Sequence, residues 1–241
     1  MIRFVFKQKG QNVEHLARPV LANLDQRALV LVGLMGCGKT SVGRRLATAL
    51  GVRFVDADEE IERSASKSVA DIFADHGEQY FRDGERRVIA RLLREGPVVI
   101  ATGGGAYMNA TTRDNIKAHG VSIWLKADLH VLMKRVMRRD NRPLLKTADP
   151  EGTMRRLMTE RYPVYAGADM TVESRDVPHD EMVAHVLKGL LNGPLGPHTG
   201  PVTGPTLAVV PVEPWAAGTS DPAQSNQADL AQLDPSKKAQ R

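Results

Sequence analysis

The stretch GLMGCGKT, residues 33–40, fits the phosphate-binding pattern G-x-x-x-x-G-K-[ST] in full. An apolar, β-branched run at 28–32 comes directly before it, and 41–50 follows with apolar residues at helical spacing. A strand, a glycine loop and a helix in this order surround one anion with backbone N–H groups and a helix N-terminus. In this arrangement Lys39 reaches the β- and γ-phosphates and the Thr40 hydroxyl holds Mg²⁺. The stretch therefore predicts a nucleoside triphosphate site.

Strand-like and helix-like segments alternate on both sides of this loop. Strands are expected at 28–33, 52–55, 97–101, 121–125 and 169–173. Helices are expected at 39–50, 58–65, 69–75, 78–95, 111–118, 128–139, 152–166 and 179–191. The alternation predicts an α/β fold in which helices cover both faces of a parallel sheet. Right-handed crossovers then place ligand sites at the carboxyl ends of the strands.

The two ends of the chain differ in composition from this central domain, residues 28–192. Residues 1–27 carry an apolar, partly helical pattern broken by Pro19, and we interpret them as an N-terminal extension. The pattern leaves open whether this extension packs on the domain. Residues 193–241 are rich in Pro, Gly, Ala, Ser and Gln, and we expect a disordered tail because they bury too little apolar surface.

Bulk properties exclude several classes of protein. The single cysteine, Cys37, rules out a disulfide within the chain and fits a reducing cytoplasm, and we interpret it as a small residue that suits the loop. No apolar segment approaches the length of a membrane span, and the opening run is too short for a signal peptide. The formal charge of +5 is spread along the chain with few aromatic residues, which favours small anionic ligands over nucleic acid. We expect a cytoplasmic protein with neither a nucleic-acid nor a membrane partner.

Two acids, Asp56 and Asp58, follow the strand expected at 52–55. Alternate residues at a strand end project in similar directions, so both carboxylates can face the ligand. One can hold Mg²⁺ through water, and the other can orient an attacking hydroxyl or accept its proton. N-capping of the next helix by Asp58 is the structural alternative, and capping does not exclude catalysis.

Four further features carry groups that could bind a ligand. Arg82 and Glu85 stand three apart on a helix and share a face, where an arginine fork suits a substrate carboxylate and a solvated ion pair is the alternative. The glycines at 103–105 follow a strand and permit close approach of the backbone to a ligand. The basic link at 138–145 can close over a triphosphate. Arg161 lies in a helix that leads to the last strand, and a surface charge is its alternative interpretation.

Taken in this order, the features resemble the shikimate kinase family. The resemblance covers residues 28–192 and rests on the loop together with Asp-x-Asp, Phe-Arg-x-x-Glu, Thr-Gly-Gly-Gly, Arg-Pro-Leu-Leu and Glu-Arg-x-x-x-Tyr. It implies a three-layer P-loop kinase fold with a five-stranded parallel sheet, a lid and a substrate-binding segment. It also implies phosphorylation of the 3-hydroxyl of shikimate by ATP with Mg²⁺, on the route to chorismate and aromatic amino acids. We expect a monomer whose partners are these small molecules.

The resemblance also implies roles for individual residues. The nucleotide would be held by Gly36, Cys37, Gly38, Lys39, Thr40, Ser41, Arg138 and Arg142. Shikimate would be held by Asp58, Arg82, Gly103, Gly104, Gly105 and Arg161. Thr40 and Asp56 would serve the metal, while Lys39, Asp58 and Arg142 would be catalytic. Arg135 and Arg138 both qualify to pack on adenine, and Arg175 is a further candidate for the adenine edge.

Other functions compete with this one. A kinase of gluconate or of a nucleoside monophosphate shares the loop, although the two arginines suit a carboxylate better than a base. A guanine-nucleotide switch would carry Asn-Lys-x-Asp, which the chain lacks. A binding module with a vestigial loop fits poorly with intact Lys39, Thr40, Asp56 and Asp58.

Overall fold

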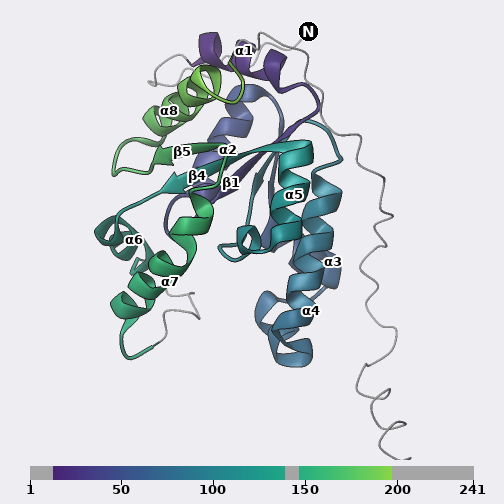
Figure 1. The fold of residues 1–241 in the computed structure, drawn as a ribbon, viewed down its shortest axis with the longest axis vertical. Coiled ribbons are helices and arrows are strands. Elements are labelled where there is room, and N and C mark those ends of the chain that lie inside the picture. Colours follow the sequence, from purple (N-terminus) through teal and green to yellow (C-terminus); the bar gives the residue numbers. More distant parts are fainter. Residues whose placement is uncertain (1–12, 139–146, 197–241) are drawn as a thin grey trace, which may run out of the picture.

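The computed structural model describes residues 13–138 and 147–196, and its centre is a parallel sheet of five strands. The strands lie in the order β2-β3-β1-β4-β5 (Figure 1). Their bounds are β1 Ala28–Val32, β2 Arg53–Asp56, β3 Val98–Ala101, β4 Gly120–Lys126 and β5 Met170–Glu173. The predicted strands agree with these bounds to within one residue at each end, and the predicted fold class is confirmed.

The helices of the described residues connect these strands. They are α1 Glu14–Leu24, α2 Lys39–Leu50, α3 Ala57–Ala65, α4 Val69–Leu92, α5 Ala110–His119, α6 Leu129–Val136, α7 Pro150–Tyr165 and α8 His179–Asn192, with a 3₁₀ turn at Ala106–Met108. None of them is long and apolar enough to cross a membrane, within the part of the chain that the structure describes.

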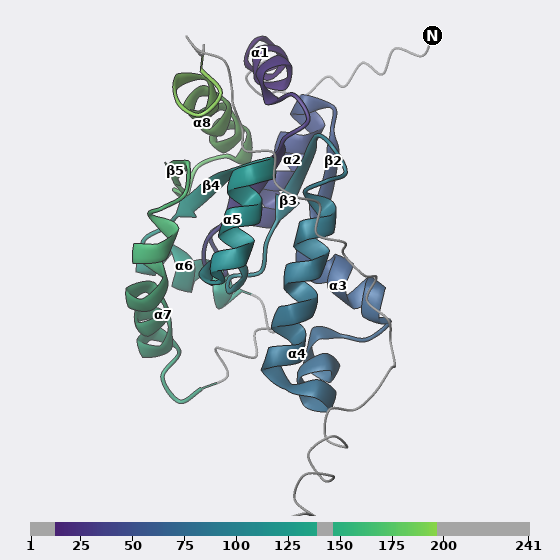
Figure 2. The ribbon, with the colours of Figure 1, turned by 45° about the vertical axis from the view of Figure 1, so that its right-hand side comes forward.

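Helices cover both faces of the sheet. Every residue of β1 and β3 is buried, and because strand side chains alternate between the faces, neither face is open to water there. On one side α2 packs on β1, β2 and β3 and contacts α1 and α8, whereas α5 packs on β4 and contacts α4. Figure 2 shows α5 in front of the strands and α2 behind them. The result is the three-layer arrangement expected from the sequence.

A kink in α4 separates the two helices that the sequence predicts at 69–75 and 78–95. Gly77 has φ of 78° and ψ of 178°, a backbone conformation that other residues rarely adopt. A Cβ at Gly77 would meet nothing within 4 Å, so the backbone angle rather than crowding demands glycine. The second half of α4 thereby takes its own direction and carries Arg82 and Glu85 to the carboxyl edge of the sheet.

Part of the N-terminal extension packs on the domain. Helix α1 continues through Pro19, and its residues Ala17, Val20 and Leu24 are buried against α2 and α8. The side-chain amide of Asn23 also donates a hydrogen bond of 2.9 Å to the carbonyl of Leu195. Packing therefore outweighs the backbone hydrogen bond that proline removes.

Three stretches that carry sequence predictions lie wholly or partly outside the described residues. They are the first residues of the N-terminal extension, the basic link with Arg142, and the predicted tail beyond residue 196.

Candidate active site

The phosphate loop connects β1 to α2 at the carboxyl edge of the sheet. Gly33 and Gly38 have φ of 136° and 100°, where a side chain would strain the backbone. A Cβ at Gly36 would come 2.8 Å from Cγ1 of Val136, so glycine lets α6 lie against the loop. No side chain caps α2, whose first N–H groups, including that of Ser41, lack intrahelical acceptors. The loop therefore has the anion-binding geometry that the sequence predicts.

The side chain of Lys39 folds back over this loop. Its ammonium donates hydrogen bonds of 2.8 Å to the carbonyl of Gly33 and 3.0 Å to that of Leu34. Cys37 is buried beneath, with its sulfur 3.8 Å from the ammonium. The positive charge thus stands at the mouth of the loop, where a bound phosphate would compete with neutral carbonyls for it.

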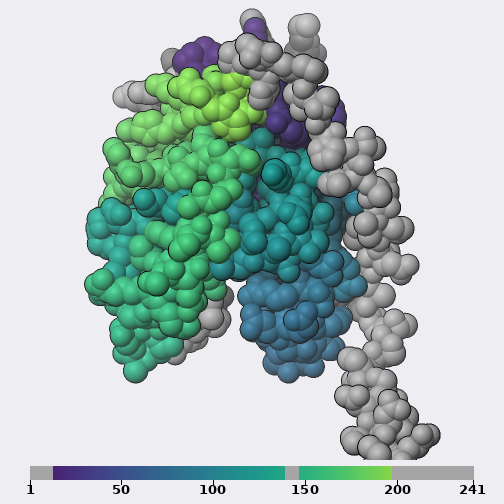
Figure 3. Space-filling view, in the orientation of Figure 1, coloured from purple at the N-terminus to yellow at the C-terminus, as the bar shows by residue number. Residues whose placement is uncertain are grey.

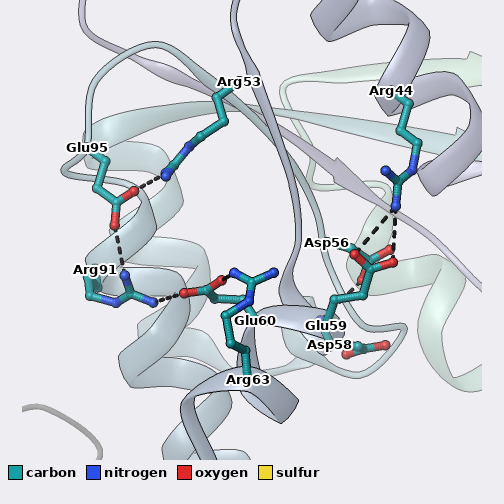
Figure 4. Close-up of polar contacts among 9 residues, drawn as sticks. All are labelled: Arg44, Arg53, Asp56, Asp58, Glu59, Glu60, Arg63, Arg91 and Glu95. Atoms are coloured by element: carbon teal, nitrogen blue, oxygen red, sulfur yellow. Dashed lines mark hydrogen bonds and ion pairs between the residues drawn. The ribbon is translucent and has the colours of Figure 1, made fainter.

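Thr40 and Asp56 join the first turn of α2 to the end of β2. The Thr40 hydroxyl donates to Oδ2 of Asp56 at 2.8 Å, and Oδ1 of Asp56 accepts from the backbone N–H of Asp58 at 3.2 Å. Asp56, not Asp58, is therefore the N-cap of α3, and the proposed capping role of Asp58 is wrong. The Asp58 carboxylate is left for other partners, and Figure 4 shows it on the turn that follows Asp56.

The oxygens of Thr40 and Asp56 fit a magnesium site. Both are hard donors, and Mg²⁺ takes one or two protein ligands while keeping waters and substrate phosphates. No group of three or more His, Cys, Asp or Glu able to hold a metal occurs among the described residues. Two protein oxygens leave room for the waters and phosphate oxygens that complete the coordination of Mg²⁺.

A network of ion pairs ties α3 to α4 and β2. Arg91 pairs with both Glu60 and Glu95, Glu95 also pairs with Arg53, and Glu60 with Arg63 (Figure 4). Single exposed pairs contribute little to stability, but linked pairs hold several elements in one geometry. The network fixes the start of α3, which carries Asp58.

The glycine run that follows β3 lies beside the phosphate loop. The backbone N–H and the hydroxyl of Thr102 both donate to the carbonyl of Leu31, at 3.1 and 3.0 Å. A Cβ at Gly103 would lie 2.7 Å from Oδ1 of Asp58 and 2.8 Å from Oε1 of Glu85. Gly103 has no left-handed φ, so close approach rather than backbone conformation requires glycine here. Two carboxylates from α3 and α4 thus meet this backbone.

The next two glycines each contact one arginine. A Cβ at Gly104 would lie 3.3 Å from Nη1 of Arg161, which comes from α7. A Cβ at Gly105 would lie only 2.6 Å from Nη1 of Arg82, which comes from α4. The structure therefore brings together Asp58, Arg82 and Arg161, which the sequence predicts to share a site. Figure 3 shows a hollow between the lobes that α7 and α4 form.

Charge and burial raise the pKa of two carboxyl groups in this cluster. Burial raises the pKa of Asp58, and the nearby carboxylate of Asp56 raises it further. Burial also raises the pKa of Glu85, which Arg82 offsets only in part across a 2.8 Å ion pair. Glu85 is only 3% exposed and its Oε1 has no hydrogen-bond partner. A group that binds here can therefore gain from both carboxyls.

Glu85 was missed as a site residue by the sequence analysis, which identified only its pairing with Arg82. Its contact with the Gly103 backbone depends on how α4 packs against the end of β3. A three-residue spacing on one helix carries no signal for that contact.

Arg135, from α6, reaches the phosphate loop. Its guanidinium donates 3.3 Å to the carbonyl of Gly36 and 2.9 Å to the hydroxyl of Ser174. That hydroxyl in turn donates 2.7 Å to the carbonyl of Cys37. Arg138 is exposed at the end of the described segment. Ser174, a buried serine after an edge strand, gave no signal in the sequence.

Of two other arginines expected at the nucleotide site, Arg175 lies within the described residues and Arg142 does not. The backbone carbonyl of Arg175 accepts a hydrogen bond of 2.6 Å from Arg135, and its own guanidinium pairs with Glu173. Arg142 lies outside the described residues.

Comparisons with known proteins agree with this geometry. The family model described as shikimate kinase matches residues 35–191. A shikimate kinase from Bradyrhizobium diazoefficiens is 60% identical over 171 residues, which are 71% of this chain and 83% of that protein. One from Paramagnetospirillum magneticum is 54% identical over 180 residues, which are 74% of this chain and 92% of that protein.

Solved structures give the same result. The shikimate kinase from Acinetobacter baumannii in complex with shikimate aligns with a TM-score of 0.68 at 36% identity and covers 72% of this chain and 98% of that one. The shikimate kinase from Aquifex aeolicus aligns with a TM-score of 0.60 at 30% identity, and the alignment covers 68% of this chain and 96% of that one. With its phosphate loop, glycine run and charged cluster in place, the chain belongs to the shikimate kinase family.

Proposed function

We propose a division of roles among the residues of this site for the reaction of the family. The reaction is ATP-dependent phosphorylation of shikimate at its 3-hydroxyl, which gives shikimate 3-phosphate and ADP and serves aromatic amino acid biosynthesis. The observation that carries the proposal is the meeting of Asp58, Arg161 and Arg82 at one glycine run beside the phosphate loop.

Shikimate is held by its carboxylate and its hydroxyls. Arg82 and Arg161 come from helices on opposite sides of the glycine run, and two guanidinium groups can clamp one carboxylate. Asp58 accepts hydrogen bonds from hydroxyls on the other side of the ring. Glycines 103–105 let the substrate and these side chains approach the backbone closely.

ATP is held by residues 36–41, whose backbone N–H groups and helix N-terminus receive the phosphates. Lys39 exchanges its loop carbonyls for phosphate oxygens. Arg142 supplies further positive charge from the basic link, and Arg135 or Arg138 packs on the adenine. The contact of Arg135 with the loop favours Arg135.

Thr40, with its hydroxyl, and Asp56, in the outer shell, would hold Mg²⁺. When bound, the metal neutralises charge on the β- and γ-phosphates.

Transfer is in line. The bond from the 3-oxygen of shikimate to the γ-phosphorus forms while the bond from that phosphorus to the β,γ-bridging oxygen breaks. Asp58 orients the hydroxyl and takes its proton, and Lys39 and Arg142 meet the charge on the transferring oxygens. Positioning supplies most of the rate, and a closed lid excludes water as a competing acceptor.

The gluconate alternative is not favoured. The curated relatives at 51–60% identity are named shikimate kinases. We also propose that the enzyme works in the cytoplasm as a monomer, and its single cysteine, which can form no disulfide within the chain, suits a reducing compartment.

The test is a coupled ADP-release assay with shikimate, quinate and gluconate as acceptors. We expect turnover with shikimate and little with the other two, and phosphorus NMR of the product should show phosphate on the 3-oxygen. The Lys39→Ala variant should lose about 10²–10³-fold in kcat while retaining its fold. Preferential turnover of gluconate, or near-normal turnover by Lys39→Ala, would contradict the proposal.

A further inference from the structure

Tyr165 links the two parts of the site that face the substrate carboxylate. Its hydroxyl donates a hydrogen bond to the backbone carbonyl of Gly104. The Arg161 guanidinium lies near the same hydroxyl, and its charge opposes part of the rise in the pKa of Tyr165 that burial causes. Arg161 and Tyr165 stand one turn apart on α7 and share a face, and Nη1 of Arg161 lies 3.3 Å from the position of a Cβ on Gly104. The phenol of Tyr165, the guanidinium of Arg161 and the backbone of Gly104 thus lie together.

The Tyr165 ring is fixed in place by its neighbours. The residue is fully buried, and its ring centroid lies 5.9 Å from that of Trp124 and 6.3 Å from those of Tyr107 and Tyr162. Burial raises the pKa of Tyr165 to about 12, so the hydroxyl keeps its proton and remains a donor at neutral pH. The hydroxyl is therefore a fixed hydrogen-bonding group next to the flexible side chain of Arg161.

We propose that Tyr165 is a positioning residue that sets Arg161 and the Gly104 peptide for the carboxylate of shikimate. The inference rests on the proposed function, in which Arg161 binds that carboxylate. An arginine carries several rotatable bonds, and a fixed polar neighbour reduces the freedom that binding must remove. The hydrogen bond to the Gly104 carbonyl also orients the planar trans peptide, which fixes the direction of the Gly105 N–H.

Tyr162 offers a matched control on the same helix. It is part of the same aromatic cluster, and its ring stands edge-on to Trp124 with centroids 4.9 Å apart. Its hydroxyl also donates to a backbone carbonyl, that of Ala127, and burial raises its pKa to about 12 as well. Removing this hydroxyl therefore has a similar structural cost but leaves the Gly104 contact intact.

The experiment compares Tyr165→Phe with Tyr162→Phe, which both keep the ring. We expect Tyr165→Phe to raise the KM and the calorimetric Kd for shikimate about tenfold, because the hydrogen bond to the Gly104 carbonyl and the polar neighbour of Arg161 are both lost. Its KM for ATP should stay within about twofold. Tyr162→Phe should leave both KM values within about twofold, and melting temperatures of the two variants should fall by similar amounts.

A double-mutant cycle separates this inference from the proposed function. In an Arg161→Ala background, Tyr165→Phe should add less than about twofold to the shikimate KM, because the group it positions is gone. If Arg161→Ala raises this KM and Tyr165→Phe does not, the inference is wrong and the proposed function stands. If Arg161→Ala itself leaves the KM unchanged, the carboxylate role of Arg161 fails. Equal effects of Tyr165→Phe on both substrates, or equal effects of the two tyrosine variants, would also overturn the inference.

A second measurement covers the case in which Tyr165→Phe does not fold. A polyfluorinated tyrosine placed at position 165 is acidic enough to ionise near neutral pH in spite of its burial, and it then cannot donate to the Gly104 carbonyl. The shikimate KM should rise with pH in this protein and not when fluorotyrosine stands at position 162. The same pH profile at both positions would refute the positioning role.

Discussion

The hydroxyl of Thr40 donates a hydrogen bond of 2.8 Å to Oδ2 of Asp56. This bond joins the first turn of α2, after the phosphate loop, to the end of β2. This contact joins two motifs that stand 16 residues apart in the chain. It also orients the carboxylate that we expect to hold magnesium through water, because the other carboxylate oxygen is held by the N–H of Asp58.

The first prediction concerns the Mg²⁺ concentration that the enzyme requires for activity. Asp56→Asn should raise the Mg²⁺ concentration for half-maximal activity about 10–100-fold, the usual effect of losing an outer-shell partner. Mg²⁺ titrations at saturating ATP and shikimate measure it. Glu59→Gln is the control, because Glu59 lies one turn on, is exposed and pairs with Arg44 (Figure 4). An equal shift in both variants would point to general loss of negative charge instead.

The second prediction concerns the steric role of Gly105. In Gly105→Ala the new Cβ would come 2.6 Å from Nη1 of Arg82 and displace the far end of that side chain. Because φ at Gly105 is −95°, alanine fits the backbone, and folding should be little affected. We expect the shikimate KM to rise about tenfold with the ATP KM unchanged, as measured by steady-state kinetics. A large drop in melting temperature with unchanged kinetics would assign Gly105 to folding instead.

The sequence predicts much of this fold because its signals are local. The strand expected at 28–33 and the helix expected at 39–50 follow from apolar periodicity and from the loop between them, and the structure has the strand at Ala28–Val32 and the helix at Lys39–Leu50. The glycine run could be assigned to the carboxyl edge because parallel strands all end there. The chemistry of the side chains then indicated which residues bind which part of a substrate: arginine suits a carboxylate, and aspartate suits hydroxyl groups.

What the sequence could not predict depends on contacts between distant segments. The buried position of Glu85 follows from the packing of α4 against Gly103, and the roles of Ser174 and Tyr165 follow from hydrogen bonds to the loop and to the glycine run. The choice of Asp56 over Asp58 as the helix cap turns on where β2 ends, which differs by one residue from the prediction.

The third prediction concerns stability and pH at Glu85. Because burial raises the folded-state pKa above its ordinary value of 4.5, the native state binds more protons than the unfolded state between these two pKa values. The Glu85 contribution to the free energy of unfolding therefore falls as pH rises through that window and is constant above it. Below pH 4.5 the carboxyl is neutral in both states.

Glu85→Gln tests this sign, because glutamine resembles the neutral acid at every pH. The free energy of unfolding of the variant, relative to the original chain, should increase as pH rises through the window and then level off. Urea unfolding at a series of pH values from 4 to 8 measures the difference. If the free energy of unfolding of the variant, relative to the original chain, instead decreased as pH rises, Arg82 would be holding the pKa of Glu85 below its ordinary value.

The last prediction separates stability from catalysis in α1. Leu24 is fully buried and Leu21, on the same helix, is 38% exposed. Leu24→Ala should lower the free energy of unfolding by about 2–4 kcal/mol, whereas Leu21→Ala should change it by less than about 1 kcal/mol. Helix α1 joins the sheet at the amino end of β1, away from the carboxyl edge where the site lies, so kcat and both KM values should stay within about twofold below the melting temperature. Urea unfolding and steady-state assays on the same samples measure both effects. A loss of kcat in Leu24→Ala that persists where the variant is fully folded would show that this helix also acts on the site through α2.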